Sequence, residues 1–209
     1  VTDTLLKMYW RTDSVQVIDR VIEKTGAEGF TGDNMEDNME DNMKDNMLNI
    51  YNETLKSCNM GSSMDEGSWD KEGKCSELGG GVHQICMGFK EKTKDFSTET
   101  GQSDWSVKRI GKNHCVCLGA WSLYVEKNKH RIHEIKDHLQ CESIPKAALT
   151  RDYVEKWSTW NGYEKDNQIL TGVNTLVKHC LEKGNKKQKK SLRKIHTTMV
   201  ESDIYKDIF

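Results

Sequence analysis

The segment GKNHCVCLGAW, residues 111–121, is the most apolar run of a very polar chain, and it decides the predicted fold. An extended backbone over residues 114–119 would place Cys115 and Cys117 on the same face of a strand. The earlier segment GGGVHQICMGF, residues 79–89, predicts a glycine-rich turn followed by another strand. We therefore expect two strands in one small sheet, buried on both faces at the second strand.

Helices are predicted before and after this sheet in the sequence. Apolar residues recur at helical spacing over residues 14–24, and again over residues 146–160 and 167–182. The last two segments predict a helical hairpin that covers the sheet. The expected fold class is therefore α+β, with a small sheet built from residues ~80–122 and covered by helices. An N-terminal helix, the C-terminal helical hairpin and a basic tail are added to it.

The chain divides into four predicted segments. Residues 1–32 contain the N-terminal amphipathic helix, and residues 33–47 are an acidic methionine repeat, DNMEDNMEDNMKDNM. Because Asp and Asn compete for the backbone, the repeat is predicted to be a linker, with a docking helix that presents methionines as the alternative. Residues 48–182 form the cysteine- and histidine-containing α+β domain with the C-terminal helices, and residues 183–209 form the basic tail.

Composition and cysteine usage set the expected compartment. Only 35% of the residues are hydrophobic, and the net charge of -2 gives no overall attraction to nucleic acid or to an anionic membrane. The longest apolar run is far shorter than the roughly 20 residues that span a bilayer, so no membrane association is predicted. The odd count of seven cysteines and a start without an apolar signal predict reduced thiols in the cytoplasm, with the nucleus as an alternative.

Six cysteine and histidine side chains are candidate metal ligands. Two thiolates from one strand face could supply half of a tetrahedral zinc site. However, the spacings do not match the paired CxxC units of a zinc ribbon, and free cysteine is among the most buried residue types. Packing is therefore the main hypothesis for these thiols, with no cofactor expected and structural zinc as the alternative. The candidate ligands are Cys58, Cys75, His83, Cys86, Cys115 and Cys117.

The sequence contains no complete catalytic signature, so the prediction leans against an enzyme. LGGGV at residues 78–82 lacks the lysine of a P-loop and the spacing of a dinucleotide fingerprint. HRIHEIKDH at residues 130–138 lacks an HExxH motif, and its histidines are taken as incidental in an exposed connection. The enzymatic alternative is a thiol-dependent reaction, with Cys75 or Cys86 as nucleophile and His83 beside it.

Five motifs in order resemble the family catalogued as domain of unknown function 2237, over about residues 55–121. They are LKSC, GSWDKEGKC, LGGGVHQIC, FSTETGQSDWS and GKNHCVCLGAW. The chain departs from the family at His114, where the family has tryptophan. The resemblance implies a compact α+β domain in which the candidate cysteines and His83 form one set, and it brings no known activity.

The predicted function is therefore a soluble, non-enzymatic intracellular domain with clustered reduced cysteines and an open question about a structural metal. A third alternative is an interaction or nucleic-acid accessory protein that acts through the basic tail. Such a run can contact phosphate backbones weakly and without sequence specificity, and a protein partner is equally open. The candidate contacts are Lys186, Lys187, Lys189, Lys190, Arg193 and Lys194.

Overall fold

The computed structural model describes most of the chain from residue 47 to residue 201. The helix predicted over residues 14–24 and the methionine repeat up to residue 46 lie outside the described part, so those predictions are not tested. The described residues are 47–59, 68–76, 83–150, 153–154, 157 and 166–201.

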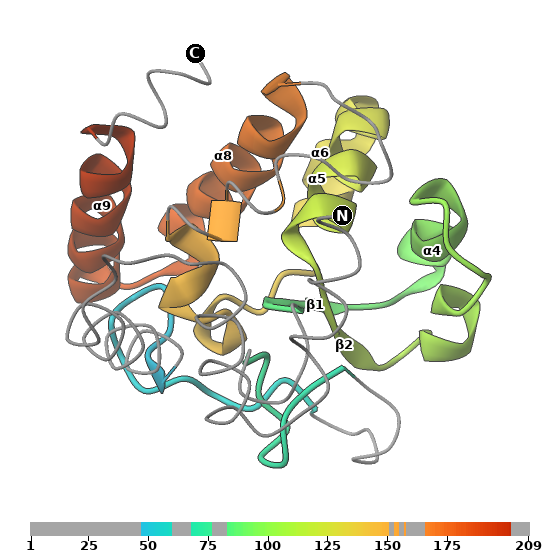
Figure 1. Ribbon diagram of the computed structural model, residues 1–209, viewed down its shortest axis with the longest axis horizontal. Coiled ribbons are helices and arrows are strands. Elements are labelled where there is room, and N and C mark those ends of the chain that lie inside the picture. The colour runs from blue at the N-terminus through green and yellow to red at the C-terminus, as the bar shows by residue number, and fades with distance from the viewer. Residues whose placement is uncertain are drawn as a thin grey trace, which may run out of the picture. The chain divides into compact units, whose positions relative to one another are not determined.

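The predicted α+β class is confirmed. Strands β1 (Ile85–Gly88) and β2 (Asn113–Val116) form a two-stranded antiparallel sheet in which Cys86 lies opposite Cys115. In Figure 1 the helices lie above and beside this sheet. The other elements, in chain order, are η3 (Glu91–Thr93), α4 (Phe96–Glu99), η4 (Ser106–Arg109), α5 (Leu118–Lys127), η5 (Lys129–Arg131), α6 (Ile132–Lys136), η6 (Cys141–Ser143), η7 (Lys146–Leu149), α8 (Asp166–Lys183) and α9 (Lys186–Glu201).

The second strand is shorter than predicted. β2 ends at Val116, Cys117 is the N-cap residue of α5, and α5 begins at Leu118. All eight residues from Leu118 to Val125 are buried, so α5 is buried around its whole circumference at this end. Hydrophobic periodicity cannot distinguish such a helix from a buried strand, which is why the extended prediction failed beyond Val116.

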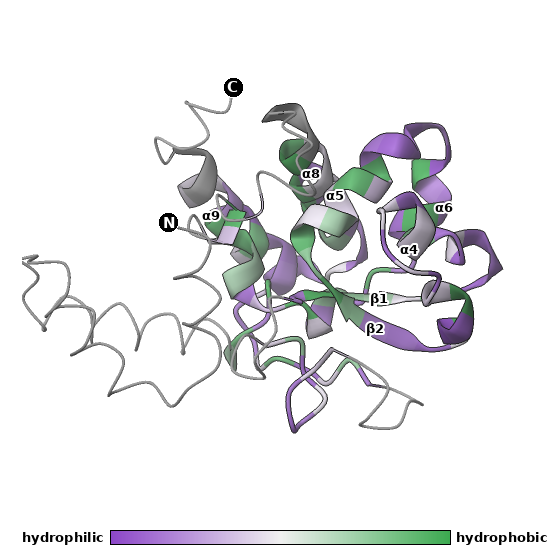
Figure 2. Cartoon of the chain, turned by 45° about the vertical axis from the view of Figure 1, so that its right-hand side comes forward, coloured by the Kyte–Doolittle hydropathy of each residue, from purple (hydrophilic) through white to green (hydrophobic). Residues whose placement is uncertain are grey.

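The core is centred on the contact between α5 and α8, which lie side by side in Figure 1. Gly172 allows the two helices to approach, because a Cβ atom there would lie 2.0 Å from the Ser122 Oγ. The Trp121 Nε1 donates a hydrogen bond of 3.0 Å to the Gly172 carbonyl oxygen across the same contact. Figure 2 shows green, hydrophobic residues on both helices where they face the interior.

The C-terminal helical pair is confirmed, but it consists of α8 and α9. The basic tail is therefore helical as far as Glu201. Asn185 caps the N-terminus of α9, since its Oδ1 accepts hydrogen bonds from the backbone N–H groups of Lys187 (2.9 Å) and Gln188 (3.0 Å). Leu192 of α9 is fully buried against the core. In the range 146–160, where a helix was predicted, the structure shows the short 3-10 helix η7 at the start, and most of the residues after 150 lie outside the described part.

Three disulfide bonds fix the irregular segments to this frame. Cys58–Cys86 joins the segment 47–59 to β1, Cys75–Cys115 joins the segment 68–76 to β2, and Cys141–Cys180 joins η6 to α8. A two-stranded sheet is marginally stable by itself. Closing loops with sequence separations of 28, 40 and 39 residues should each stabilise the fold by about 3.5–4 kcal/mol through the unfolded chain. The bridges therefore supply stability that so small a sheet lacks.

The prediction of clustered reduced cysteines in the cytoplasm or nucleus is wrong. Six cysteines are paired, and three disulfides are typical of an oxidising environment, as in secreted or extracellular proteins. The odd count misled the prediction because the seventh cysteine, Cys117, is a buried free thiol. The odd number of cysteines is therefore explained by one buried, unpaired cysteine, and it does not argue for a reducing compartment.

Candidate functional site

A pocket of about 210 Å³ lies between η4, β2 and the first turn of α5, and we call it the histidine pocket. Two histidines line it, one from the segment before β1 and one from β2. Its floor is the strand that carries the Cys75–Cys115 disulfide. The lining residues are Ser68, His83, Gln102, Trp105, Arg109, His114, Cys115, Val116, Cys117 and Ala120.

His114 is the most enclosed polar side chain of the histidine pocket, with 9% of its surface exposed. Its ring centroid lies 4.6 Å from that of Trp105, 6.1 Å from that of Trp69 and 6.4 Å from that of Phe89. Burial lowers the pKa of His114 to about 3, and the positive charge of Arg109 and the neighbouring His83 act in the same direction. The imidazole is therefore neutral near pH 7, with one donor and one acceptor nitrogen.

Both pocket histidines have an unsatisfied nitrogen. The Nδ1 atoms of His83 and His114 are buried and have no hydrogen-bond partner among the described residues. Burial also lowers the pKa of His83, so this imidazole too favours its neutral form. Because leaving a buried polar atom unpaired costs about 1–3 kcal/mol, two such atoms in one pocket need an explanation.

The tryptophan wall of the histidine pocket is held in place by hydrogen bonds. The Ser97 Oγ accepts from the backbone N–H groups of Trp105 (3.1 Å) and Ser106 (3.2 Å), which fixes the start of η4. The Trp105 Nε1 donates to the Gln102 Oε1 at 3.1 Å. Trp105 is therefore positioned before any ligand arrives, and η4 ends at Arg109 on the same pocket wall.

The predicted ligand sulfurs do converge, but not as thiolates. The Sγ atoms of Cys58, Cys75 and Cys86 lie within 4.8 Å of one another, and Cys86 faces Cys115 across the sheet. All four are bonded in disulfides, and a metal or a nucleophilic reaction requires the free thiolate. The alternative of a thiol enzyme with Cys75 or Cys86 as nucleophile is therefore wrong, although His83 lines a pocket. Structural zinc stays a prediction that would require prior reduction of both bridges.

Cys117 is the only free cysteine among the described residues, and it is 2% exposed. Burial raises the pKa of its thiol to about 12, against the smaller opposing effect of backbone N–H groups at the start of α5. Near neutral pH the thiol is protonated, so it fills space as an apolar group and does not act as a nucleophile.

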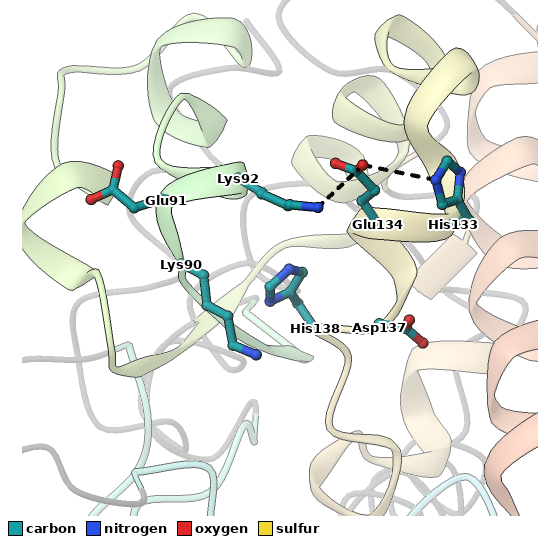
Figure 3. Close-up of a pocket in the computed structure, with 7 residues that line it drawn as sticks. All are labelled: Lys90, Glu91, Lys92, His133, Glu134, Asp137 and His138. Carbon is teal, nitrogen blue, oxygen red and sulfur yellow. Dashed lines mark ion pairs between the residues drawn. The ribbon is translucent and has the colours of Figure 1, made fainter.

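A larger and more open depression of about 540 Å³ lies between η3 and α6 (Figure 3), and we call it the lysine–glutamate depression. Figure 3 shows Glu134 between Lys92 and His133, at 3.2 Å from the Lys92 Nζ and 3.8 Å from the His133 Nε2. The second acid, Asp137, lies 3.4 Å from the Lys183 Nζ. The lining residues are Lys90, Glu91, Lys92, His133, Glu134, Asp137 and His138.

The acids of this depression are paired with bases, so it offers little unsatisfied charge. The Glu91 carboxylate also has a partner, the Lys94 Nζ at 3.0 Å. Of the three histidines in the run 130–138, His130 and His133 are exposed as predicted, whereas His138 is only 6% exposed and its buried Nδ1 has no hydrogen-bond partner among the described residues. Because the histidine pocket holds two unpartnered buried nitrogens and the depression holds one, we take the smaller histidine pocket as the candidate functional site.

The sequence analysis named His83, Cys115 and Cys117 as candidate metal ligands, and all three line the histidine pocket. It did not name His114 as a candidate, and it missed Trp105 and Arg109 as well. These two residues lie in a polar stretch whose only signal was the FSTETGQSDWS motif of the family resemblance. The basic residues predicted to contact nucleic acid lie on α9, far along the chain from this pocket, and most of them are exposed.

No protein-family model matches the chain, and no curated protein or solved structure matches it either. The resemblance to domain of unknown function 2237 therefore stays a prediction. Among the described residues, no helix combines the length and apolar character needed to cross a bilayer.

Proposed function

We propose that this protein is a disulfide-braced ligand-binding domain whose histidine pocket holds a small carboxylate with a flat, apolar body. The observation that carries the proposal is the pair of buried, unpartnered Nδ1 atoms of His83 and His114 in one pocket. A ligand that accepts hydrogen bonds from both imidazoles would remove the cost of leaving them unpaired.

The charge of the pocket favours an anion. Both imidazoles are neutral near pH 7 and can each donate one N–H, while Arg109 supplies the positive charge. A guanidinium matches the geometry of a carboxylate, which accepts two parallel hydrogen bonds. The proposed carboxylate therefore faces Arg109 and accepts from His83 and His114.

The remaining walls favour a flat, apolar body on the ligand. The Trp105 ring, Val116 and Ala120 line the same pocket, and an aromatic face stacks well on a planar group. The volume of about 210 Å³ is below the roughly 300–1,000 Å³ typical of sites for drug-sized ligands. The ligand should thus be no larger than a single substituted ring.

Calorimetric titration of the oxidised full chain with benzoate tests the proposal. Benzoate should bind, and benzamide, which keeps the ring and loses the charge, should bind at least about tenfold more weakly, equivalent to ~1.4 kcal/mol. The variant Arg109→Gln should weaken benzoate binding by a similar factor. The matched control is Lys108→Gln, which removes the same charge from an exposed neighbour on η4.

Two outcomes would contradict the proposal. One is the absence of any binding heat, and of any change in the NMR chemical shift of the Trp105 indole N–H, when benzoate is added at millimolar concentration. The other is an equal loss of affinity in Arg109→Gln and Lys108→Gln, which would mean that net charge and not the pocket attracts the anion. The predictions of a protein partner and of weak nucleic-acid contact through the basic tail stay predictions.

A further inference from the structure

Helix α9 has two distinct faces. Leu192 is fully buried and Gln188 is 7% exposed, where it donates to the carboxylates of Glu53 (2.9 Å) and Glu142 (3.2 Å). This face is fixed to the core. In Figure 2 α9 accordingly carries both green and purple residues.

The other face is basic. With about 100° of rotation per residue, the exposed basic side chains of α9 fall within an arc of about 120°, directly opposite Gln188 and Leu192. They span about 12 Å along the helix axis, at about 1.5 Å per residue. These residues are Lys186, Lys187, Lys190, Arg193 and Lys194.

These charges are not neutralised by the described part of the protein. Elsewhere, exposed lysines pair with acids, as in Lys56–Glu142 at 2.5 Å and Lys92–Glu134 at 3.2 Å. None of the five α9 residues forms an ion pair with a residue that the structure describes. Five like charges held this closely by a rigid helix repel one another, so a polyanion that binds them would relieve that repulsion.

We propose that this basic face of α9 binds sulfated polysaccharide. A run of lysine and arginine fits either nucleic acid or a heparin-like glycan, because both present closely spaced anions. The three disulfides favour the glycan, since they are typical of the extracellular environment in which such chains are displayed. The interaction is electrostatic and does not involve the histidine pocket.

Fluorescence anisotropy with a labelled heparin oligosaccharide and the oxidised full chain tests this proposal. Binding should weaken at least about tenfold between roughly 50 and 200 mM salt, because bound counterions are released. The variant Lys187→Gln/Lys190→Gln/Lys194→Gln should lose at least about tenfold in affinity at the lower salt. Its matched control, Lys71→Gln/Lys90→Gln/Lys108→Gln, removes three exposed lysines elsewhere and should keep the affinity within about twofold.

Circular dichroism melting should show both triple variants to be folded, since every substituted side chain is exposed. Equal losses in the two variants would overturn the proposal, because only net charge would then matter. Tighter binding to a DNA duplex than to heparin under the same conditions would also overturn it and would identify α9 as a nucleic-acid surface. Affinity that is independent of salt would exclude a polyanion site altogether.

Discussion

The histidine pocket and the lysine–glutamate depression differ in how their polar groups are satisfied. The depression is the larger, at about 540 Å³ against 210 Å³, but its acids have basic partners such as Lys92 for Glu134. The smaller pocket holds two buried imidazoles, of His83 and His114, each with an unpartnered Nδ1. The depression has one such atom, the buried Nδ1 of His138. The number of unsatisfied buried groups that line one opening, and not the size of the opening, therefore distinguishes the histidine pocket from the depression.

The two regions also differ in what builds them. The histidine pocket rests on β2, which is covalently attached through Cys115 to the segment 68–76. The depression lies between η3 and α6, which are joined by the ion pair of Lys92 with Glu134, and water and salt can screen this pair (Figure 3). Removing a disulfide at the pocket should therefore change the free energy of unfolding and the ligand affinity strongly. Removing an ion pair at the depression should change the free energy of unfolding only slightly.

The largest effect is expected from removing disulfides. The double variants Cys75→Ala/Cys115→Ala and Cys141→Ala/Cys180→Ala should each lower the free energy of unfolding by about 3.5–4 kcal/mol in urea titrations. Only the first should also weaken benzoate binding by about tenfold or more, because Cys115 lies in the pocket floor. Equal affinities in the two folded variants would show that the bridge does not shape the pocket.

An intermediate effect is expected from the buried imidazole of His114. Its pKa is about 3 in the folded protein and about 6.5 in an unfolded chain. The unfolded state therefore binds the proton first as pH falls, so the stability contributed by this neutral group is present above pH ~6.5 and is lost toward pH ~3. Between about pH 6.5 and 5, one such group lowers the free energy of unfolding by about 1.5 kcal/mol.

The variant His114→Phe removes this titration and keeps a ring among Trp69, Phe89 and Trp105. Its free energy of unfolding should fall less than that of the wild type over the same pH range, by about 1.5 kcal/mol. Chemical denaturation at several pH values measures the difference. Identical pH profiles would mean that His114 takes up its proton in the folded state, which would contradict the neutral imidazole on which the proposed site depends.

The sequence predicted the fold class and part of the site because those features depend on local patterns. The strand around Cys86 and the α8 helix follow from apolar spacing, and His83, which was chosen by residue type as a candidate ligand, lines the histidine pocket. By contrast, the pairing of Cys58 with Cys86 depends on where the chain folds back, and no spacing rule fixes it. The same is true of Arg109, which reaches the pocket only because η4 lies against β2.

The smallest effect is expected in the lysine–glutamate depression. Glu134→Gln breaks the ion pairs with Lys92 and His133, whose side chains are 62% and 73% exposed. Exposed ion pairs contribute about 0–1 kcal/mol and weaken further with salt, so the free energy of unfolding should fall by less than about 1 kcal/mol at low salt. Benzoate affinity should stay unchanged, because no residue of the depression lines the histidine pocket. A tenfold loss of benzoate affinity in Glu134→Gln would instead place the ligand in the depression and reverse the assignment of the two regions.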